Sequence, residues 1–156
     1  MLFIAHRGNV YGPNPTMENH PSHVEGALML GFDVEVDVWY HDGDLHLGHD
    51  EPKYRMPSSY KNHTHIWFHA KNVEALMYLN NYRLSPQTSP FFWHQEDDYT
   101  LTSNHKIWTY PGKKLMRNSI AVMPETAYDG ELWDCYAICT DYVIKYKEEY
   151  ESRNRR

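Results

Sequence analysis

The chain has few cysteines, no excess of basic residues and no long apolar segment. Its two cysteines, Cys135 and Cys139, lie four residues apart in a strand-like segment. That separation is too long for a disulfide on a strand, so we expect free thiols and a reducing compartment. With 15 Lys and Arg against 21 Asp and Glu, the formal charge is −6, which argues against a nucleic-acid partner. No apolar run approaches the roughly 20 residues of a membrane span, and residues 1–5 lack the basic start of a signal peptide. These absences predict a cytoplasmic protein.

Histidines and aromatic residues are abundant instead. Aromatic side chains make up 15% of the 156 residues, and the 11 histidines are more than structural roles usually require. Tyr and Trp combine an apolar body with a polar tip, and histidine exchanges protons near neutral pH. The length suits a single domain over residues 1–156. The composition therefore indicates one domain with a surface or groove rich in aromatic rings.

The most informative stretch is an acid-alternating strand followed by a returning segment. Its acids are Asp33, Glu35 and Asp37. On a strand these three share one face and the intervening valines share the other. An ordinary solvated edge strand would explain the alternation equally well. However, Asp42-Gly43 predicts a tight turn, and residues 45–48 then form a return strand that brings His49 back toward the acids. Acids at a strand end beside a returning histidine indicate a site.

The first fifty residues predict a strand, a helix and a second strand. Residues 2–5 form a short apolar run, typical of a buried strand, which ends in His6 and Arg7. Residues 18–30 carry apolar side chains at helical spacing, and Gly31 closes that helix. A strand–helix–strand unit makes its two strands parallel. Polar residues directly after a buried strand lie where α/β folds place their ligand sites.

Five more strands follow, but the connections between them shorten. We expect these strands at residues 65–70, 91–93, 106–110, 119–123 and 136–139. A helix starts at Asn72, residues 51–63 form a loop with at most a short helix, and the charged tail from Asp141 is helical. After Trp93 and Tyr110 there is little room for a crossover helix. The prediction is an α/β fold, a compact, pared-down TIM-type (β/α) barrel with shortened or missing helices in its C-terminal half.

Several motifs in this framework resemble one known family. They read Ala5-His6-Arg7-Gly8, Met17-Glu18-Asn19, Gly31-Phe32-Asp33-Val34-Glu35-Val36-Asp37-Val38, Asp42-Gly43 and His49-Asp50. In order and spacing they resemble the signature of the glycerophosphodiester phosphodiesterases, which belong to the phosphatidylinositol-phospholipase-C-like barrels. The resemblance covers the first third of the chain. Further along it is limited to Lys71 and to Thr140-Asp141-Tyr142.

The resemblance implies a role for each motif residue. It implies that His6 and His49 form an acid–base pair and that Glu35 and Asp37 are ligands of a divalent cation. General chemistry agrees, because imidazole has an unperturbed pKa of about 6.5 and paired carboxylates suit Mg²⁺ or Ca²⁺. An ion pair of the two acids with Arg7 or with a lysine is the structural alternative.

The remaining polar residues are expected on the substrate side. Arg7 and Lys71 can hold a phosphate, Arg7 through its bidentate fork. Glu18 supports substrate binding through hydrogen bonds. One position departs from the family pattern, because His69 stands where a glutamate normally provides a further metal ligand. Imidazole admits Mn²⁺ or Zn²⁺ as well. Asp33, although it shares the acidic face, is expected to make structural hydrogen bonds.

Two functions follow from this pattern. The first is a metal-dependent phosphodiesterase that cleaves a glycerophosphodiester-like or lipid-derived phosphodiester by His/His acid–base catalysis. The second is a barrel that binds a phosphorylated ligand without turnover. In both, the expected partner is a small-molecule or lipid-derived phosphate compound rather than a nucleic acid, and no membrane span is expected.

Overall fold

The computed structural model describes residues 1–81, 89–127 and 132–155. Its sheet contains β1 (Leu2–His6), β2 (Asp33–His41), β3 (Asp44–Leu47), β4 (Tyr54–Arg55), β5 (Ile66–Ala70), β6 (Phe91–Trp93), β7 (Tyr99–Leu101), β8 (Ile107–Thr109), β9 (Ser119–Val122) and β10 (Ala137–Thr140). The helices are α1 (Pro21–Met29), α2 (Val73–Asn81) and α3 (Val143–Asn154), with 3₁₀ turns η1 (Ser58–Asn62) and η2 (Leu132–Asp134). None of the described helices is long and apolar enough to cross a membrane.

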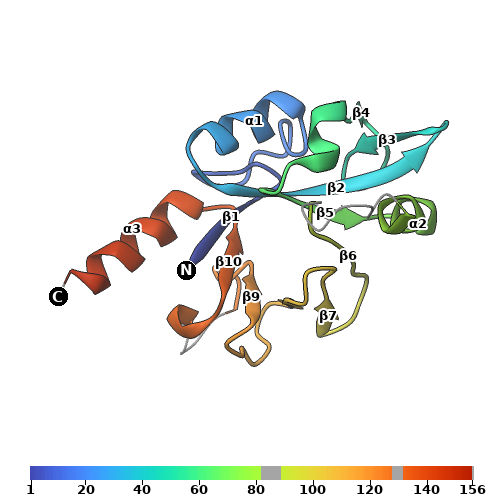
Figure 1. Cartoon of the computed structure of the whole chain (residues 1–156). Coiled ribbons are helices and arrows are strands. Elements are labelled where there is room, and N and C mark those ends of the chain that lie inside the picture. The colour runs from blue at the N-terminus through green and yellow to red at the C-terminus, as the bar shows by residue number, and fades with distance from the viewer. Residues whose placement is uncertain (82–88, 128–131, 156) are drawn as a thin grey trace.

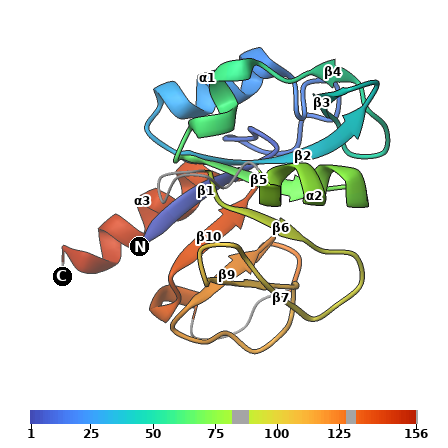
Figure 2. The ribbon, with the colours of Figure 1, turned by 45° about the vertical axis from the view of Figure 1, so that its right-hand side comes forward.

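The strands form a curled sheet that is parallel through its middle. Neighbouring strands run in the order β6-β5-β2-β1-β10-β9-β8, each pair parallel. A hairpin of β3 and β4 adds antiparallel to β2, and β7 adds antiparallel to β8. Figures 1 and 2 show α1 and the β3–β4 hairpin on one side of β2, with β6 to β10 on the other.

The curl brings the two ends of the parallel order together. Ser103, just after β7, donates its backbone N–H to the carbonyl of Phe91 over 2.8 Å, and the N–H of Phe91 donates to Ser103 Oγ over 3.0 Å. Among the described residues, no strand ladder joins β6 to β8. The sheet is therefore a partial barrel, which agrees with the predicted α/β class and with the predicted shortening of the second half.

Aromatic stacking fills the gap where that ladder is missing. The rings of Phe92 in β6 and Trp108 in β8 lie 4.2 Å apart at 28°, and His69 in β5 stacks on Phe92 at 4.9 Å and 16°. Phe92 and Trp108 belong to a buried cluster on the inner face of the curl, formed by Ile4, Trp67, Phe92, Trp108, Ile120, Ala137 and Cys139. Close ring contacts in an apolar interior stabilise the approach of strands that share no backbone hydrogen bonds.

The alternation of β2 divides its side chains between two environments. Val34, Val36 and Val38 are fully buried in the outer cluster that also contains Val24 of α1 and Ala75 of α2. The acids point to the inner face of the curl. Burial of the valines under two helices explains why this strand is not a solvated edge strand.

Helix α1 is shorter than the range of residues 18–30 that the spacing of apolar residues predicted. It begins after His20, whose ring accepts the N–H of Ser22 over 3.2 Å, and Pro21 occupies its first turn, where a missing N–H costs nothing. It ends before Gly31, which has a φ of 84°, a conformation that glycine adopts without strain.

The other elements agree with the predicted ranges, with a few corrections. Strands β4 and β7 were not predicted, because two or three exposed or half-exposed residues carry no periodic signal. The short helix expected within residues 51–63 is η1. Both cysteines are buried free thiols, as predicted, but only Cys139 lies on a strand, since Cys135 precedes β10. Among the described residues, no α-helix lies between β6 and β10.

Candidate functional site

The carboxyl ends of the parallel strands surround a cleft of about 740 Å³. Residues at or just after the ends of several strands line it, among them His6, His69, Lys71, His94, Tyr110 and Met123. Glu35 of β2 also lines it, opposite His6 in the register of β1 and β2. This is where parallel α/β sheets place their ligand sites, and the volume is in the range of small-molecule pockets. His49 and Arg7 also line the cleft.

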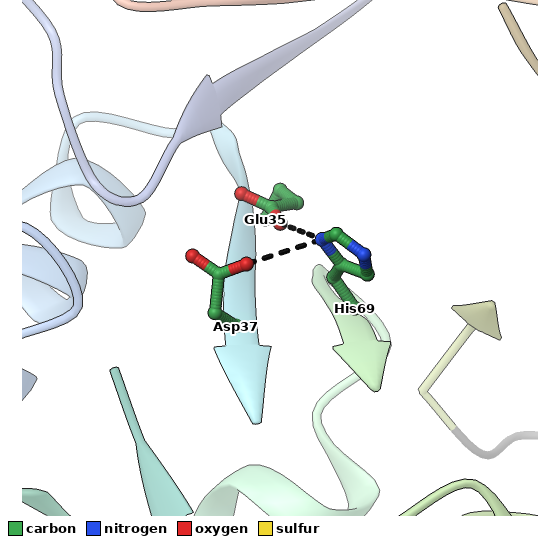
Figure 3. A group of neighbouring side chains, drawn as sticks. All are labelled: Glu35, Asp37 and His69. Atoms are coloured by element: carbon green, nitrogen blue, oxygen red, sulfur yellow. Dashed lines mark ion pairs between the residues drawn. The ribbon is translucent and has the colours of Figure 1, made fainter. Parts of the chain in front are cut away.

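Three side chains inside this end of the sheet form a potential cation site. Ligand atoms of Glu35, Asp37 and His69 all lie within 4.8 Å of one another. His69 Nδ1 is 3.1 Å from Asp37 Oδ1 and 3.6 Å from Glu35 Oε1 (Figure 3). The register of β2 against β5 places Asp37 opposite His69. Both acids are buried, and neither exposes more than 1% of its surface.

The imidazole of His69 is fixed from its other nitrogen. Its Nε2 donates to the backbone carbonyl of His94 over 2.8 Å, so Nδ1 faces the two acids. Burial lowers the pKa of His69, but its contacts with Asp37 and Glu35 outweigh burial and raise the pKa to about 9. Metal-ligating histidines commonly donate their second N–H to a carbonyl in this way. The same orientation lets a neutral imidazole offer the Nδ1 lone pair to a cation.

Asp37 has one satisfied oxygen and one unsatisfied oxygen. Its Oδ2 accepts a hydrogen bond from Asn19 Nδ2 over 2.9 Å, and Arg7 Nε lies 3.0 Å away as an ion pair. Its Oδ1 is buried and has no well-formed hydrogen bond to any described residue, although His69 Nδ1 and, at 3.5 Å, Lys71 Nζ are close. Burial would raise the pKa of Asp37, yet His69, Arg7 and Lys71 hold it well below its usual range.

These features fit a divalent cation bound by two carboxylates and one imidazole. A buried carboxylate oxygen without a hydrogen bond is costly, and a cation facing Glu35 and His69 would satisfy it. Two oxygens and one nitrogen suit Mg²⁺, Mn²⁺ or Zn²⁺. The alternative to a metal site, an ion pair of the acids with basic side chains, is also present, because Asp37 forms ion pairs with both Arg7 and Lys71.

His6 is held at the end of β1 by an acid from the far end of the chain. Its Nδ1 is 2.8 Å from Oδ1 of Asp141, the residue just after β10, and its Nε2 is 4.0 Å from Glu35 Oε2. Burial lowers the pKa of His6, whereas the hydrogen bond to Asp141 and the charge of Glu35 raise it, and the net shift is upward. The His6 ring is thus oriented with Nε2 on the side of Glu35.

Glu18 braces Arg7 rather than lining the main cleft. Its Oε2 accepts from Arg7 Nη1 over 2.9 Å and its Oε1 from Asn9 Nδ2 over 3.1 Å. Glu18, Arg7 and His49 border a smaller neighbouring cavity of about 230 Å³. The structure therefore places Glu18 against Arg7 and Asn9; its role in substrate binding stays a prediction.

His49 is the most exposed of the predicted site residues. Its side chain is 41% exposed and its Nδ1 lies 2.6 Å from Asp50 Oδ1. The preceding Gly48 is anchored on both sides, since its N–H donates to the Asp37 carbonyl over 3.1 Å and its carbonyl accepts from Trp39 Nε1 over 2.7 Å. A Cβ at Gly48 would collide with the backbone oxygen of Glu51. The loop therefore needs glycine to bring His49 to the cleft.

The structure separates Asp33 from this site, although it shares a face with the other two acids. Asp33 accepts hydrogen bonds from His65 Nδ1 at 2.7 Å and Trp67 Nε1 at 2.8 Å. Its structural role was predicted and is confirmed. All the other predicted residues come together: His6, Arg7, Glu35, His49, His69 and Lys71 line the cleft, with Asp37 and Glu18 behind them.

Several residues that organise the site were not predicted to do so. Asn9 is buried and donates to both Glu18 and Asp141. Asn19, in the Met17-Glu18-Asn19 motif, holds the side chain and the backbone N–H of Asp37. Glu125 accepts the hydroxyl of Thr140 over 2.8 Å and the N–H of Asp141 over 3.1 Å. Buried asparagines in a polar loop could have suggested such a role, but their partners could not be deduced.

Strained backbone also gathers around the cleft. Arg7, Asn19 and Met123 have φ values of 51°, 62° and 47°. Residues other than glycine rarely adopt this left-handed conformation, and such strain is common at functional sites. Here the surrounding hydrogen bonds hold the strained residues in place, since the N–H of Asn19 donates to the Arg7 carbonyl over 3.1 Å and that of Met123 to the Cys139 carbonyl over 2.8 Å.

Comparison of the chain with protein-family models, curated proteins and solved structures gives no match. The resemblance to the glycerophosphodiester phosphodiesterases therefore rests on the ordered motif residues alone. This resemblance does not assign the chain to a family, and the proposal of a function is based on the residues of the cleft.

Proposed function

We propose that this protein is a metal-dependent phosphodiesterase, a pared-down relative of the phospholipase-C-like TIM-type barrels. One observation carries the proposal: His6 and His49 line the same cleft as Glu35, Arg7 and Lys71. Cleavage of a phosphodiester requires an acid, a base and positive charge at the phosphate. The cleft gathers candidates for all three tasks.

In this proposal one divalent cation is held by Glu35, Asp37 and His69. When bound, it neutralises charge on the non-bridging phosphate oxygens. Arg7 and Lys71 bind the same phosphate from the protein side, and Glu18 keeps the Arg7 guanidinium in place. Because His69 is a nitrogen ligand, Mn²⁺ and Zn²⁺ are candidate cations in addition to Mg²⁺ and Ca²⁺.

His6 and His49 divide the proton transfers between them. One takes a proton from the attacking hydroxyl, and the other returns a proton to the leaving alkoxide. Asp141 keeps His6 in one orientation through Nδ1 and stabilises its charged form, so that Nε2 handles the proton. The attacking group is water or a neighbouring hydroxyl of the substrate. A glycerophosphodiester-like or lipid-derived diester is the substrate that the motif resemblance suggests.

Cation titration of the full chain tests the metal part of the proposal. After chelator treatment, calorimetric titration with Mn²⁺ or Mg²⁺ should give one site per chain. Glu35→Gln and Asp37→Asn should each weaken that affinity at least about tenfold, because each removes a charged ligand. Asp33→Asn is the matched control, since Asp33 lies on the same face of β2 but bonds to His65 and Trp67.

Hydrolysis of a glycerophosphodiester by the same samples tests the chemistry. We expect activity that is lost with chelator and restored with the cation. Equal affinity for the cation in Asp37→Asn and Asp33→Asn would exclude the proposed metal site. Hydrolysis that resists the chelator would exclude the metal-dependent mechanism.

The second candidate is a phosphate-binding protein without turnover. The ion pairs of Asp37 with Arg7 and Lys71 favour it, because they balance the buried charge in the absence of a cation. It predicts that chelator-treated protein binds inorganic phosphate and that added cation produces no hydrolysis.

A further inference from the structure

The cleft has two chemically different walls. Titratable side chains at the ends of β1, β2 and β5 form one wall. The other is formed at the ends of β6, β8 and β9 by His94, Trp108, Tyr110, Pro111, Val122 and Met123, with the uncharged polar residues Gln95 and Thr126 beside them. Among the described residues lining this second wall, which we call the ring wall, none is acidic. The proposed phosphate chemistry makes no use of the ring wall.

Tyr110 is the most accessible ring of this wall. It follows β8, and its backbone N–H donates to the Asp98 carbonyl over 3.0 Å. The residue remains 49% exposed and its ring stacks on His94 at 5.9 Å and 30°. An exposed tyrosine ring at the edge of a cleft offers a flat apolar surface to a ligand.

The ring wall is held rigidly against the candidate metal site. His94 Nδ1 is 3.0 Å from Thr100 Oγ1, while the His94 carbonyl accepts the Nε2 proton of His69. Below Tyr110, Trp108 is only 4% exposed and packs on Phe92. The distance between the charged wall and the ring wall is thus set by packed rings and hydrogen bonds rather than by a loose loop.

We propose that the ring wall binds a planar, apolar ester arm of the substrate, an aromatic ring that stacks on Tyr110 while its phosphate meets the charged wall. The inference rests on the proposed function, because it takes the charged wall as the phosphate site. The absence of an acid on the described ring wall disfavours a cationic arm, which would need a counter-charge when partly desolvated. The stack of Tyr110 on His94, with 30° between the ring planes, favours a flat group over a flexible chain.

Calorimetric binding of simple phosphonates to the full chain, with Mg²⁺ added, tests the inference without turnover. Phenylphosphonate should bind at least about tenfold more tightly than methylphosphonate, because the ring buries additional apolar surface. Tyr110→Ala should weaken phenylphosphonate binding about 3- to 10-fold and leave methylphosphonate unchanged. Tyr110→Phe should bind like the wild type. Tyr99→Ala is the matched control, a tyrosine 41% exposed on β7 that is outside the set lining the cleft.

These measurements distinguish a failure of the ring-wall assignment from a failure of the proposed phosphodiesterase function. Equal affinities for the two phosphonates, or equal losses in Tyr110→Ala and Tyr99→Ala, would overturn the ring-wall assignment even if the protein hydrolyses diesters. Tighter binding of octylphosphonate than of phenylphosphonate would also overturn it in favour of an alkyl arm. A Tyr110-dependent preference for phenylphosphonate in a protein without hydrolytic activity would support the ring wall and refute the phosphodiesterase.

Discussion

Up to residue 81, helices α1 and α2 cover the outer face of β1, β2 and β5, whereas among the described residues no α-helix lies between β6 and β10. The covered region buries its apolar side chains outward, as with Val34 and Val36 under the helices. In β6 and β8 the large rings of Phe92 and Trp108 turn inward and stack on each other. The inner face therefore holds the buried acids in the first region and stacked rings in the second. Both regions also bury apolar side chains on the outer face, as Ala121 of β9 and Ile138 of β10 do beside Tyr146 of α3.

This difference accounts for the two walls of the cleft. Where helices supply an outer core, the inner face of the sheet can hold charged groups such as Glu35 and Asp37, since the apolar burial that stabilises the strand occurs elsewhere. At β6 and β8 the inner face carries the packed rings of Phe92 and Trp108, and it ends in an apolar wall.

The largest effect should come from emptying the aromatic stack. Phe92→Ala should lower the free energy of unfolding by about 3–5 kcal/mol, because it leaves a cavity where β6 and β8 share no backbone ladder. Leu101→Ala, at a residue 66% exposed on β7, should change it by less than about 0.5 kcal/mol. Urea denaturation measures both. Similar values for the two variants would mean that the stack does not hold β6 and β8 together.

The next effect concerns the charged wall. His6→Ala and His49→Ala should each reduce phosphodiester hydrolysis by about 10²-fold or more, because each removes one proton-transfer group. His41→Ala is the control, a histidine whose side chain is 54% exposed and pairs with Asp42 on the hairpin. Steady-state rates at saturating cation test this. Unchanged rates in His6→Ala would remove the acid–base role of the first region.

A smaller effect should follow from Asn19, which positions Asp37. Asn19→Ala should cost about 1–3 kcal/mol of stability, because it leaves the backbone N–H of Asp37 unpaired and forces alanine to adopt a φ of 62°. Asn19→Gly tolerates that φ, so it should cost less while losing the same hydrogen bonds. Thermal unfolding compares the two. A lower stability for the glycine variant would show that backbone strain contributes nothing.

The smallest effect is expected from thiol reagents. They test whether the second region, from β6 to β10, excludes solvent from its buried cysteines. Burial raises the pKa of Cys135 to about 11 and that of Cys139 well above its usual value. A raised pKa keeps each thiol protonated below that value, so the reactive thiolate is scarce at pH 8. Labelling at pH 8 should be far slower in folded than in urea-unfolded protein, and it should accelerate as pH approaches 11. Rapid labelling at pH 8 would show that the second region opens.

Much of the strand pattern could be predicted because it depends on near neighbours. Apolar runs bounded by Pro, Gly and polar residues marked β1, β6 and β9 within about one residue, and the alternation in β2 marked its two faces. The strands β4 and β7 escaped prediction, because their residues pair through tertiary contacts without a periodic signal of their own.

The candidate site could be predicted only as a set of residues, without its hydrogen bonds. The order of the motifs indicated His6, Glu35, Asp37 and His49, and the cleft brings them near one another. The partner of His6 could not be deduced, since Asp141 lies 135 residues away. The orientation of His69 depends on the carbonyl of His94, and no local pattern specifies that contact.

The sequence by itself determined that Glu35 and Asp37 share a face, because a strand repeats every two residues whatever surrounds it. It also determined that His49 follows a turn at Asp42-Gly43. Only the tertiary structure decided that the acidic face turns inward, that Asp37 Oδ1 has no well-formed hydrogen bond to any described residue, and that a wall of rings lines the same cleft as Glu35. These outcomes depend on which strands pair and which segments pack on each face of the sheet, and contacts between distant segments settle both.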